Sequence, residues 1–151
     1  LLTAEGVTNK KDLLDETYAI YEEEFPQEAQ YENDFDVTIA LLTTLIRPEN
    51  TTPIKTKSNF YSIYGACLRY YRATGRTTFR QADVIADAVT DLLISVRSNN
   101  LDGKPNSYNQ YFEAVTRAAS DKGRRAIRED ILYDIITMFD GKAGGTQTCS
   151  T

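Results

Sequence analysis

Five basic side chains in the last third of the chain have the type and spacing best suited to a chemical role. They are Arg117, Lys122, Arg124, Arg125 and Arg128. Arg124 and Arg128 are four residues apart, so they share one face of a predicted helix. Free N–H groups at the start of that helix would add to the positive charge, and the cluster could then hold a phosphate group. Alternatively, the acidic neighbours of the cluster neutralise it in ion pairs and leave an ordinary solvated face; these neighbours are Asp121, Glu129 and Asp130.

The cluster belongs to a basic central region within an acidic protein. Residues 1–46 contain 11 acidic and 2 basic side chains, residues 47–128 contain 14 basic and 7 acidic ones, and residues 129–151 contain 4 acidic and 1 basic. The net charge of −5 argues against indiscriminate nucleic-acid binding by the whole surface. A basic middle region is consistent with a local binding face, but also with attraction between oppositely charged parts of the fold.

A second basic set in this region has the same two interpretations. It comprises Lys55, Lys57, Arg69, Arg72, Arg76 and Arg80. The neighbouring Tyr70 and Tyr71 could stack on nucleic-acid bases, although we favour packing in the core for both rings. A third charged pattern is the acidic stripe of Asp83, Asp87 and Asp91, which we interpret as the outer face of an amphipathic helix that pairs with Arg80.

The groups that usually carry catalysis are scarce. Histidine is absent, which removes the commonest general base and metal ligand at neutral pH. The two cysteines, Cys67 and Cys149, are too far apart for a zinc pattern, and no nucleophile has a base partner. No glycine-rich phosphate-binding loop is present. We therefore expect no catalytic residue, no metal and no cofactor, and we do not expect this chain to be an enzyme on its own.

The composition indicates a globular protein of the cytoplasm. Apolar residues make up 41% of the 151 residues and charged residues 26%, which is typical of a folded domain. Two cysteines do not form a disulfide framework, and this fits a reducing compartment. No apolar run is long enough to cross a membrane, and no signal-peptide pattern opens the chain.

One predicted helix, over residues 58–74, organises the rest of the chain. Its apolar side chains recur at three- and four-residue steps; they are Phe60, Ile63, Tyr64, Cys67, Leu68 and Tyr71. Because no charge occurs before Arg69, this helix must be enclosed by other helices. Ser58 or Asn59 is expected to cap its start, and Gly75 to end it in a left-handed conformation.

Similar periodicity predicts five further helices around this one. They cover about residues 10–25, 27–46, 78–98, 107–118 and 124–139, and residues 47–53 form a loop between the second and third helices. We expect an all-α, antiparallel bundle of about six helices around the central buried helix, forming a single domain over residues 1–140 with a flexible tail at 141–151. Since the chain begins at Leu1 without methionine, we expect it to be a piece of a longer protein.

Three blocks of sequence carry a resemblance to a known family. The first runs from Lys11 to Phe35, the second is Lys57 to Tyr61, and the third runs from Tyr111 to Arg128. Together they resemble the helical C-terminal portion of the GmrSD-type family, bacterial restriction and phage-defence proteins whose N-terminal half is a ParB-like nuclease-type domain. The nucleotide-handling and histidine-based motifs of that family have no counterpart here. The resemblance therefore implies a non-catalytic helical module and assigns no active-site residue.

Two functions are compatible with these observations. The first is an accessory domain of a restriction or phage-defence protein that packs on a nuclease or NTPase domain and contacts DNA through the basic cluster. The alternative is a stand-alone domain for protein–protein interaction that uses its acidic N-terminal helices. An enzyme that works through carboxylates and tyrosines is a weaker third option.

Overall fold

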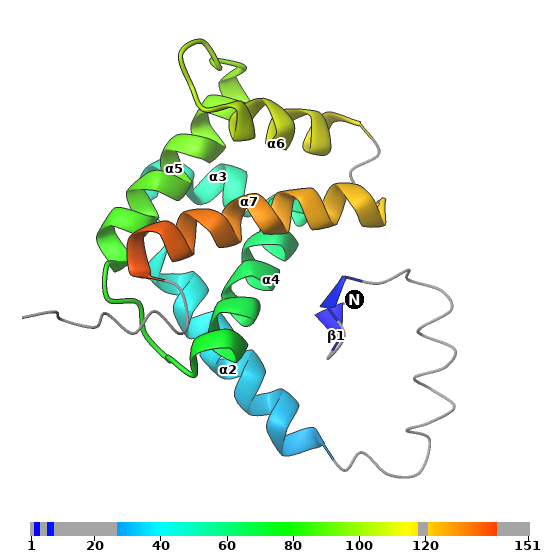
Figure 1. The fold of residues 1–151 in the computed structure, drawn as a ribbon, viewed down its shortest axis with the longest axis vertical. Coiled ribbons are helices and arrows are strands. Elements are labelled where there is room, and N and C mark those ends of the chain that lie inside the picture. The colour runs from blue at the N-terminus through cyan, green and yellow to red at the C-terminus, as the bar shows by residue number, and fades with distance from the viewer. Residues whose placement is uncertain (1, 4–5, 8–26, 118–120, 142–151) are drawn as a thin grey trace, which may run out of the picture.

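The computed structural model describes residues 2–3, 6–7, 27–117 and 121–141. These residues form six α-helices: α2 (Glu28–Thr44), α3 (Thr51–Ile54), α4 (Lys57–Thr74), α5 (Ala82–Ser98), α6 (Asn106–Thr116) and α7 (Lys122–Asp140) (Figure 1). A 3₁₀ turn, η1 (Pro48–Asn50), precedes α3, and two short strands, β1 (Leu2–Thr3) and β2 (Gly6–Val7), pair antiparallel near the N-terminus. The predicted all-α bundle is confirmed, whereas the helix predicted over residues 10–25 lies outside the described residues.

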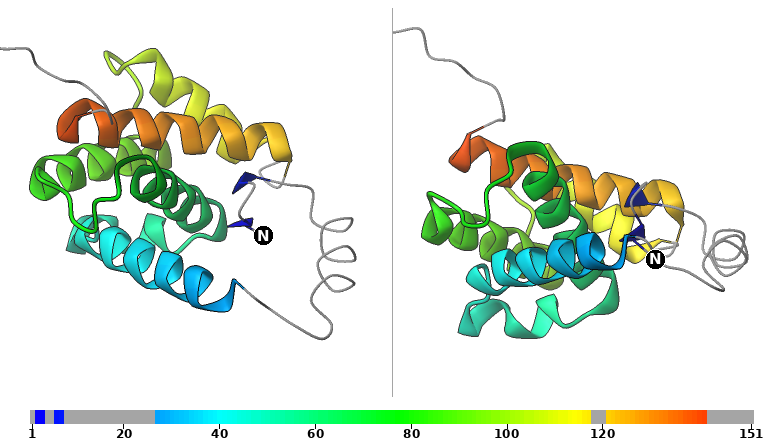
Figure 2. Two further views of the ribbon diagram at one scale, coloured as in Figure 1. Left: turned by 60° about the horizontal axis from the view of Figure 1, so that its bottom comes forward. Right: turned by 90° about the horizontal axis from the view of Figure 1, so that it is seen from below.

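The central helix of the prediction is α4. It packs against α2 on one side and α7 on the other, so that it lies between them in the left view of Figure 2. Ile63, Ala66 and Cys67 have no exposed surface. The helix ends at Gly75, whose φ of 69° is the left-handed conformation that glycine adopts without strain. The enclosure of α4 therefore follows from the apolar pattern of its sequence.

The predicted cap of α4 is wrong. The helix begins one residue earlier, with Thr56 as the extended N-cap residue, and Ser58 and Asn59 lie inside its first turn. Asn59 is buried, where its amide donates to the carbonyl of Pro53 at 2.9 Å and its side-chain oxygen accepts from the hydroxyl of Tyr111 at 2.9 Å. Its polar side chain thus serves tertiary contacts instead of the helix start.

The loop predicted over residues 47–53 is replaced by the compact turn of η1 and α3. The buried side chain of Asn50 holds this turn, because its oxygen accepts from the backbone N–H of Arg47 at 2.8 Å. Its amide donates to the carbonyl of Leu45 at 2.9 Å and to the hydroxyl of Thr90 at 2.7 Å. One asparagine therefore connects the end of α2 to α5.

The start of α5 is set by Asp140, the last residue of α7. One carboxylate oxygen of Asp140 accepts from the backbone N–H groups of Arg80 at 2.6 Å and Gln81 at 2.9 Å. The other accepts from the buried hydroxyl of Tyr70 and lies 3.5 Å from the guanidinium of Arg76. Since this cap precedes Ala82, the helix begins there and not at residue 78, where the predicted helix over residues 78–98 starts. The ring of the intervening Phe79 packs on Tyr70 instead.

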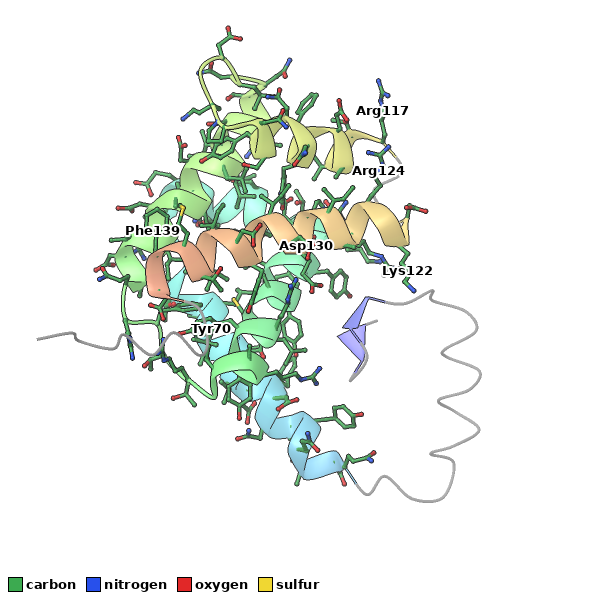
Figure 3. The ribbon with its side chains drawn as sticks, viewed as in Figure 1. Tyr70, Arg117, Lys122, Arg124, Asp130 and Phe139 are labelled. Carbon is green, nitrogen blue, oxygen red and sulfur yellow. The ribbon has the colours of Figure 1, made fainter. Side chains whose placement is uncertain are left out.

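Buried side chains of α2, α4, α5, α6 and α7 form one hydrophobic core. Its largest fully buried apolar members are Tyr70, Tyr111, Leu41, Leu45, Ile63, Ile85, Leu92, Leu93, Leu132 and Ile136. Among the described residues, no helix combines the length and the apolar character needed to cross a membrane. The core places the end of α6 and the start of α7 together at one end of the bundle (Figure 3).

Candidate nucleic-acid interface

The five predicted basic residues lie around the junction of α6 and α7. Arg117 is the residue that ends α6, in an extended conformation, and its side chain is exposed. Lys122 is the first residue of α7 and is also exposed, whereas Arg124 and Arg125 are half-buried in the same turn. The sequence cluster is thus also a cluster in space, although its members do not all point the same way.

The periodicity of α7 divides the cluster between two sides of the helix. Figure 3 shows Arg117 and Arg124 together on the side of α7 that faces α6, and Lys122 on the opposite side. Arg125 lies one turn before Glu129, whose carboxylate packs on Gly65 of α4. Lys122 and Arg125 therefore belong to the α4 side of the helix start.

Arg128 lies in the core and does not contribute to the surface. Only 1% of the residue is exposed. Its Nε donates to the hydroxyl of Ser62 on α4 at 3.0 Å, and its Nη1 donates to the carbonyl of Ala114 on α6 at 2.6 Å. Burial holds the pKa of the guanidinium below its ordinary value, and the neighbouring Tyr111 offsets part of this effect. Arg128 joins three helices, so an anion outside the protein does not reach it.

The acidic neighbours of the cluster are engaged elsewhere. The carboxylate of Asp121 accepts from the backbone N–H groups of Gly123 at 2.9 Å and Arg124 at 3.2 Å, and so caps α7. Asp130 pairs with Arg69 of α4 at 2.6 Å. A phosphate group at this end would therefore be held by side chains, since Asp121 already occupies the N–H groups that the sequence suggested for it.

Ion pairs involve three members of the second basic set, whereas its other members, Lys55, Lys57 and Arg80, take part in none among the described residues. The described residues form five such pairs: Arg47–Asp83, Arg69–Asp130, Arg72–Asp34, Arg76–Asp140 and Lys104–Asp91. Three of the five involve the second set, which supports the structural interpretation of those residues. Asp83 and Asp91 pair with Arg47 and Lys104 and not with the predicted Arg80. Arg117, Lys122 and Arg124 take part in none of the pairs within the described ranges.

Glu129, which the sequence indicated only as an acidic neighbour of the cluster, packs closely on α4. An ideal Cβ built on Gly65 would lie 2.5 Å from Oε2 of Glu129, so the carboxyl occupies the space that a larger residue would fill. Burial raises the pKa of Glu129, Arg69 lowers it in part, and Asp130 raises it further. The glycine in the middle of this apolar helix indicated that another segment of the protein packs closely there.

The aromatic and thiol groups near the second basic set point inward. Tyr70 is buried against Asp140, and the hydroxyl of Tyr71 accepts from the side chain of Asn33 at 2.9 Å. Burial also raises the pKa of the Cys67 thiol, which disfavours the reactive thiolate. Within the described part of the chain, no group of three acidic or cysteine side chains is placed to hold a metal ion.

Comparison of the chain with models of protein families, with curated proteins and with solved structures finds no match. The described residues place three cations without a salt-bridge partner, Arg117, Lys122 and Arg124, at the junction of α6 and α7.

Proposed function

We propose that this chain is a non-catalytic helical accessory domain that contacts the phosphate backbone of nucleic acid through Arg117, Lys122 and Arg124. The observation that supports this proposal most directly is that these three cations share one end of the bundle and take part in no ion pair among the described residues. Cations without acidic partners in a protein of net charge −5 create a local positive potential, which attracts a polyanion.

The wider setting of this activity is part of the same proposal. The resemblance to the GmrSD-type family supports a role in a restriction or phage-defence protein of the cytoplasm. In that setting the helical body packs on a nuclease or NTPase domain of the same protein and adds nucleic-acid affinity to it. The chemistry is then carried out by the other domain, which agrees with the scarcity of catalytic groups in this sequence.

The proposal is tested by measuring DNA binding across salt concentrations. The variant Arg117→Ala/Lys122→Ala/Arg124→Ala removes the three cations, and each lost phosphate contact should reduce the slope of log K against log salt by about 0.9 on duplex DNA. The slope should therefore fall by about 2 to 3 relative to the unmodified chain. Fluorescence anisotropy with a labelled oligonucleotide between about 50 and 200 mM salt provides the measurement.

A matched control separates a local site from a general charge effect. The variant Lys55→Ala/Arg80→Ala/Arg97→Ala also removes three exposed cations, but from α5 and from the segments that precede α4 and α5. It should retain the original slope. Equal slopes for both variants, or the absence of salt-dependent binding by the unmodified chain, would contradict the proposal.

One observation favours a stand-alone protein–protein interaction domain, although it concerns the end of α7 and not the acidic N-terminal helices that the prediction assigned to this role. Met138 is 69% exposed and Phe139 is 37% exposed at the C-terminal end of α7, far along the helix from the basic end. Exposed apolar side chains at one place suit a protein partner. If a separate protein binds this end, Met138→Ser/Phe139→Ser should weaken that association in sedimentation velocity without changing the salt slope on DNA.

A further inference from the structure

Two aspartates of this chain lie in identical tripeptides. Asp102-Gly103-Lys104 is part of the loop between α5 and α6, at the top of Figure 1, and Asp140-Gly141-Lys142 begins at the last residue of α7. An aspartate followed by glycine can cyclise, because glycine has no Cβ to obstruct the approach of its backbone nitrogen to the preceding side-chain carboxyl. Since the two tripeptides are the same, a difference in their reactivity must come from the fold.

Asp102 and Gly103 are the central residues of an exposed β-turn. The backbone N–H of Lys104 donates to the carbonyl of Leu101 at 3.1 Å, and the positive φ of 71° occurs at Gly103 and not at Asp102, as in a type II turn. Asp102 is exposed, and its carboxylate takes part in no hydrogen bond or ion pair with the residues that the structure describes. The N–H of Gly103 has no acceptor among them either. Both reacting groups are thus available, and ring closure rearranges only this exposed turn.

The corresponding groups of Asp140 and Gly141 are held by the fold. Only 3% of Asp140 is exposed, and its carboxylate accepts from the hydroxyl of Tyr70 and from two backbone N–H groups at the start of α5. The N–H of Gly141 donates to the carbonyl of Thr137 at 3.0 Å, at the end of α7. Ring closure here would break all of these hydrogen bonds at once, so Asp140 reacts only when this part of the bundle opens.

We propose that Asp102 is a site of isoaspartate formation in the folded protein and that Asp140 is protected from it. The nitrogen of Gly103 forms a bond to the side-chain carboxyl carbon of Asp102, and the carboxyl hydroxyl leaves with the amide hydrogen as one water. Water then adds to one carbonyl of the resulting succinimide ring and breaks its bond to nitrogen. Cleavage at the side-chain carbonyl restores aspartate, whereas cleavage at the backbone carbonyl leaves the main chain running through the former side chain. The reaction releases one water, consumes one water and needs no other reactant.

The modification falls in the loop that joins α5 to α6. Isoaspartate adds one carbon atom to the main chain and leaves the free carboxylate on Cα. The loop is anchored to α5 directly after the turn, because Lys104 pairs with Asp91 at 2.6 Å and Tyr108 donates to the same carboxylate at 2.9 Å. The added atom therefore enters a segment whose end is fixed. This inference does not depend on the proposed function, since the cations at the start of α7 take no part in it.

The reaction is followed by incubating the folded chain in warm, mildly acidic buffer and mapping it by mass spectrometry. An endoproteinase that cleaves before aspartate but not before isoaspartate digests each sample. Cleavage at residue 102 should be lost progressively, and a peptide lighter by one water should mark the succinimide. Cleavage at residue 140 should persist, with a rate of loss at least about 100-fold lower, because several hydrogen bonds must break there first.

The unfolded chain supplies the matched control. In guanidinium chloride the two identical tripeptides lose their different surroundings, so both sites should form isoaspartate at similar rates. In the folded protein, Asp102→Asn should react faster than the unmodified chain, because ammonia leaves in place of water. Asp102→Glu should not form isoaspartate, because the ring would need six members. Both replacements are at an exposed position and are compatible with folding.

Three results would overturn the inference. The first is loss of cleavage at equal rates at residues 102 and 140 of the folded protein, and the second is faster loss at residue 140. The third is persistent cleavage at residue 102 of the folded protein under conditions in which the unfolded chain forms isoaspartate at both sites.

Discussion

At the scale of single residues, the most informative side chain is Glu129, a carboxyl that packs on Gly65 and is partly removed from water. Because burial raises its pKa in the folded protein, the protonated form fits the fold better than the ionised form. Its contribution to stability is therefore fully present below the unfolded pKa, about 4.3 for glutamate, and is lost as the pH rises through the folded pKa.

The first prediction concerns this carboxyl. Glu129→Gln keeps the shape of the neutral form, so the variant should be more stable than the unmodified protein near neutral pH, and the two should converge below about pH 4. Melting temperatures measured by circular dichroism across this range provide the check. Glu113→Gln, on the exposed side of α6, serves as the control; a Glu129→Gln protein that is less stable at neutral pH would refute the argument.

The candidate site shows what a sequence reveals about single residues and what it does not. The positive charge near the start of α7 was visible because five cations occur within twelve positions. Their directions were not visible, since they depend on where α4 and α6 lie. Arg124 and Arg128 carry the same charge and share one face of the predicted helix. Only Arg128 lies in the core, where its guanidinium donates to the carbonyl of Ala114.

At the scale of helices, the start of α7 carries two half-buried arginines that the helix dipole disfavours. Asp121 compensates for them by accepting two backbone N–H groups. The second prediction is that Asp121→Ala destabilises the domain by about 1 kcal/mol, as other lost helix caps do, while Asp121→Asn retains most of the stability. Urea unfolding of the three proteins measures the difference. Equal stability of the alanine and asparagine variants would show that the cap contributes nothing.

The end of α7 is the second important element. The buried carboxylate of Asp140 accepts from the buried hydroxyl of Tyr70 and from the partly buried start of α5, and it pairs with Arg76, whose side chain is 31% exposed. The third prediction is that Asp140→Ala costs about 3 kcal/mol, because it leaves the buried hydroxyl of Tyr70 and two partly buried backbone N–H groups without an acceptor.

Two further variants provide comparisons for the stability of Asp140→Ala. Tyr70→Phe removes one donor of the network and should cost about 1 to 2 kcal/mol. Asp134→Ala removes an exposed carboxylate from the same helix and should stay within about 0.5 kcal/mol of the unmodified protein. Similar losses for Asp140→Ala and Asp134→Ala in urea unfolding would mean that the network does not stabilise the fold.

Helix positions were predictable to the extent that local patterns determine them. The apolar periodicity of residues 60–71 and the glycine at position 75 located α4 correctly, because both act within a few residues. The start of α5 was misplaced because its cap comes from Asp140, 60 residues away from Arg80 in the sequence. The turn at Asn50 was missed for a similar reason, since Thr90 is its distant partner.

At the scale of the whole molecule, the bundle is arranged around α4, and Cys67 lies at its centre with no exposed surface. The fourth prediction uses this thiol as a probe of global unfolding. In a Cys149→Ser background, a thiol reagent should modify Cys67 only through the unfolded state, at a rate that follows the free energy of unfolding. A loss of about 3 kcal/mol in Asp140→Ala should therefore speed modification by about 100-fold.

The control for this prediction is Asp134→Ala, whose modification rate should equal that of the unmodified protein. If Cys67 reacts as fast as a free thiol in the folded protein, α4 is accessible and the enclosed bundle is contradicted. If Asp140→Ala leaves the rate unchanged although urea unfolding shows a loss of stability, the thiol is reached through a local opening instead.

The cap formed by Asp140 also bears on how the domain is made. During synthesis, residues 70–98 leave the ribosome well before residue 140. The first turn of α5 and the hydroxyl of Tyr70 therefore lack their acceptor, the carboxylate of Asp140, until α7 has been made. The central helices therefore reach their final packing only after α7 has left the exit tunnel. We expect a nascent chain arrested before Asp140 to remain sensitive to protease, and the domain to close in one late step when its last helix arrives.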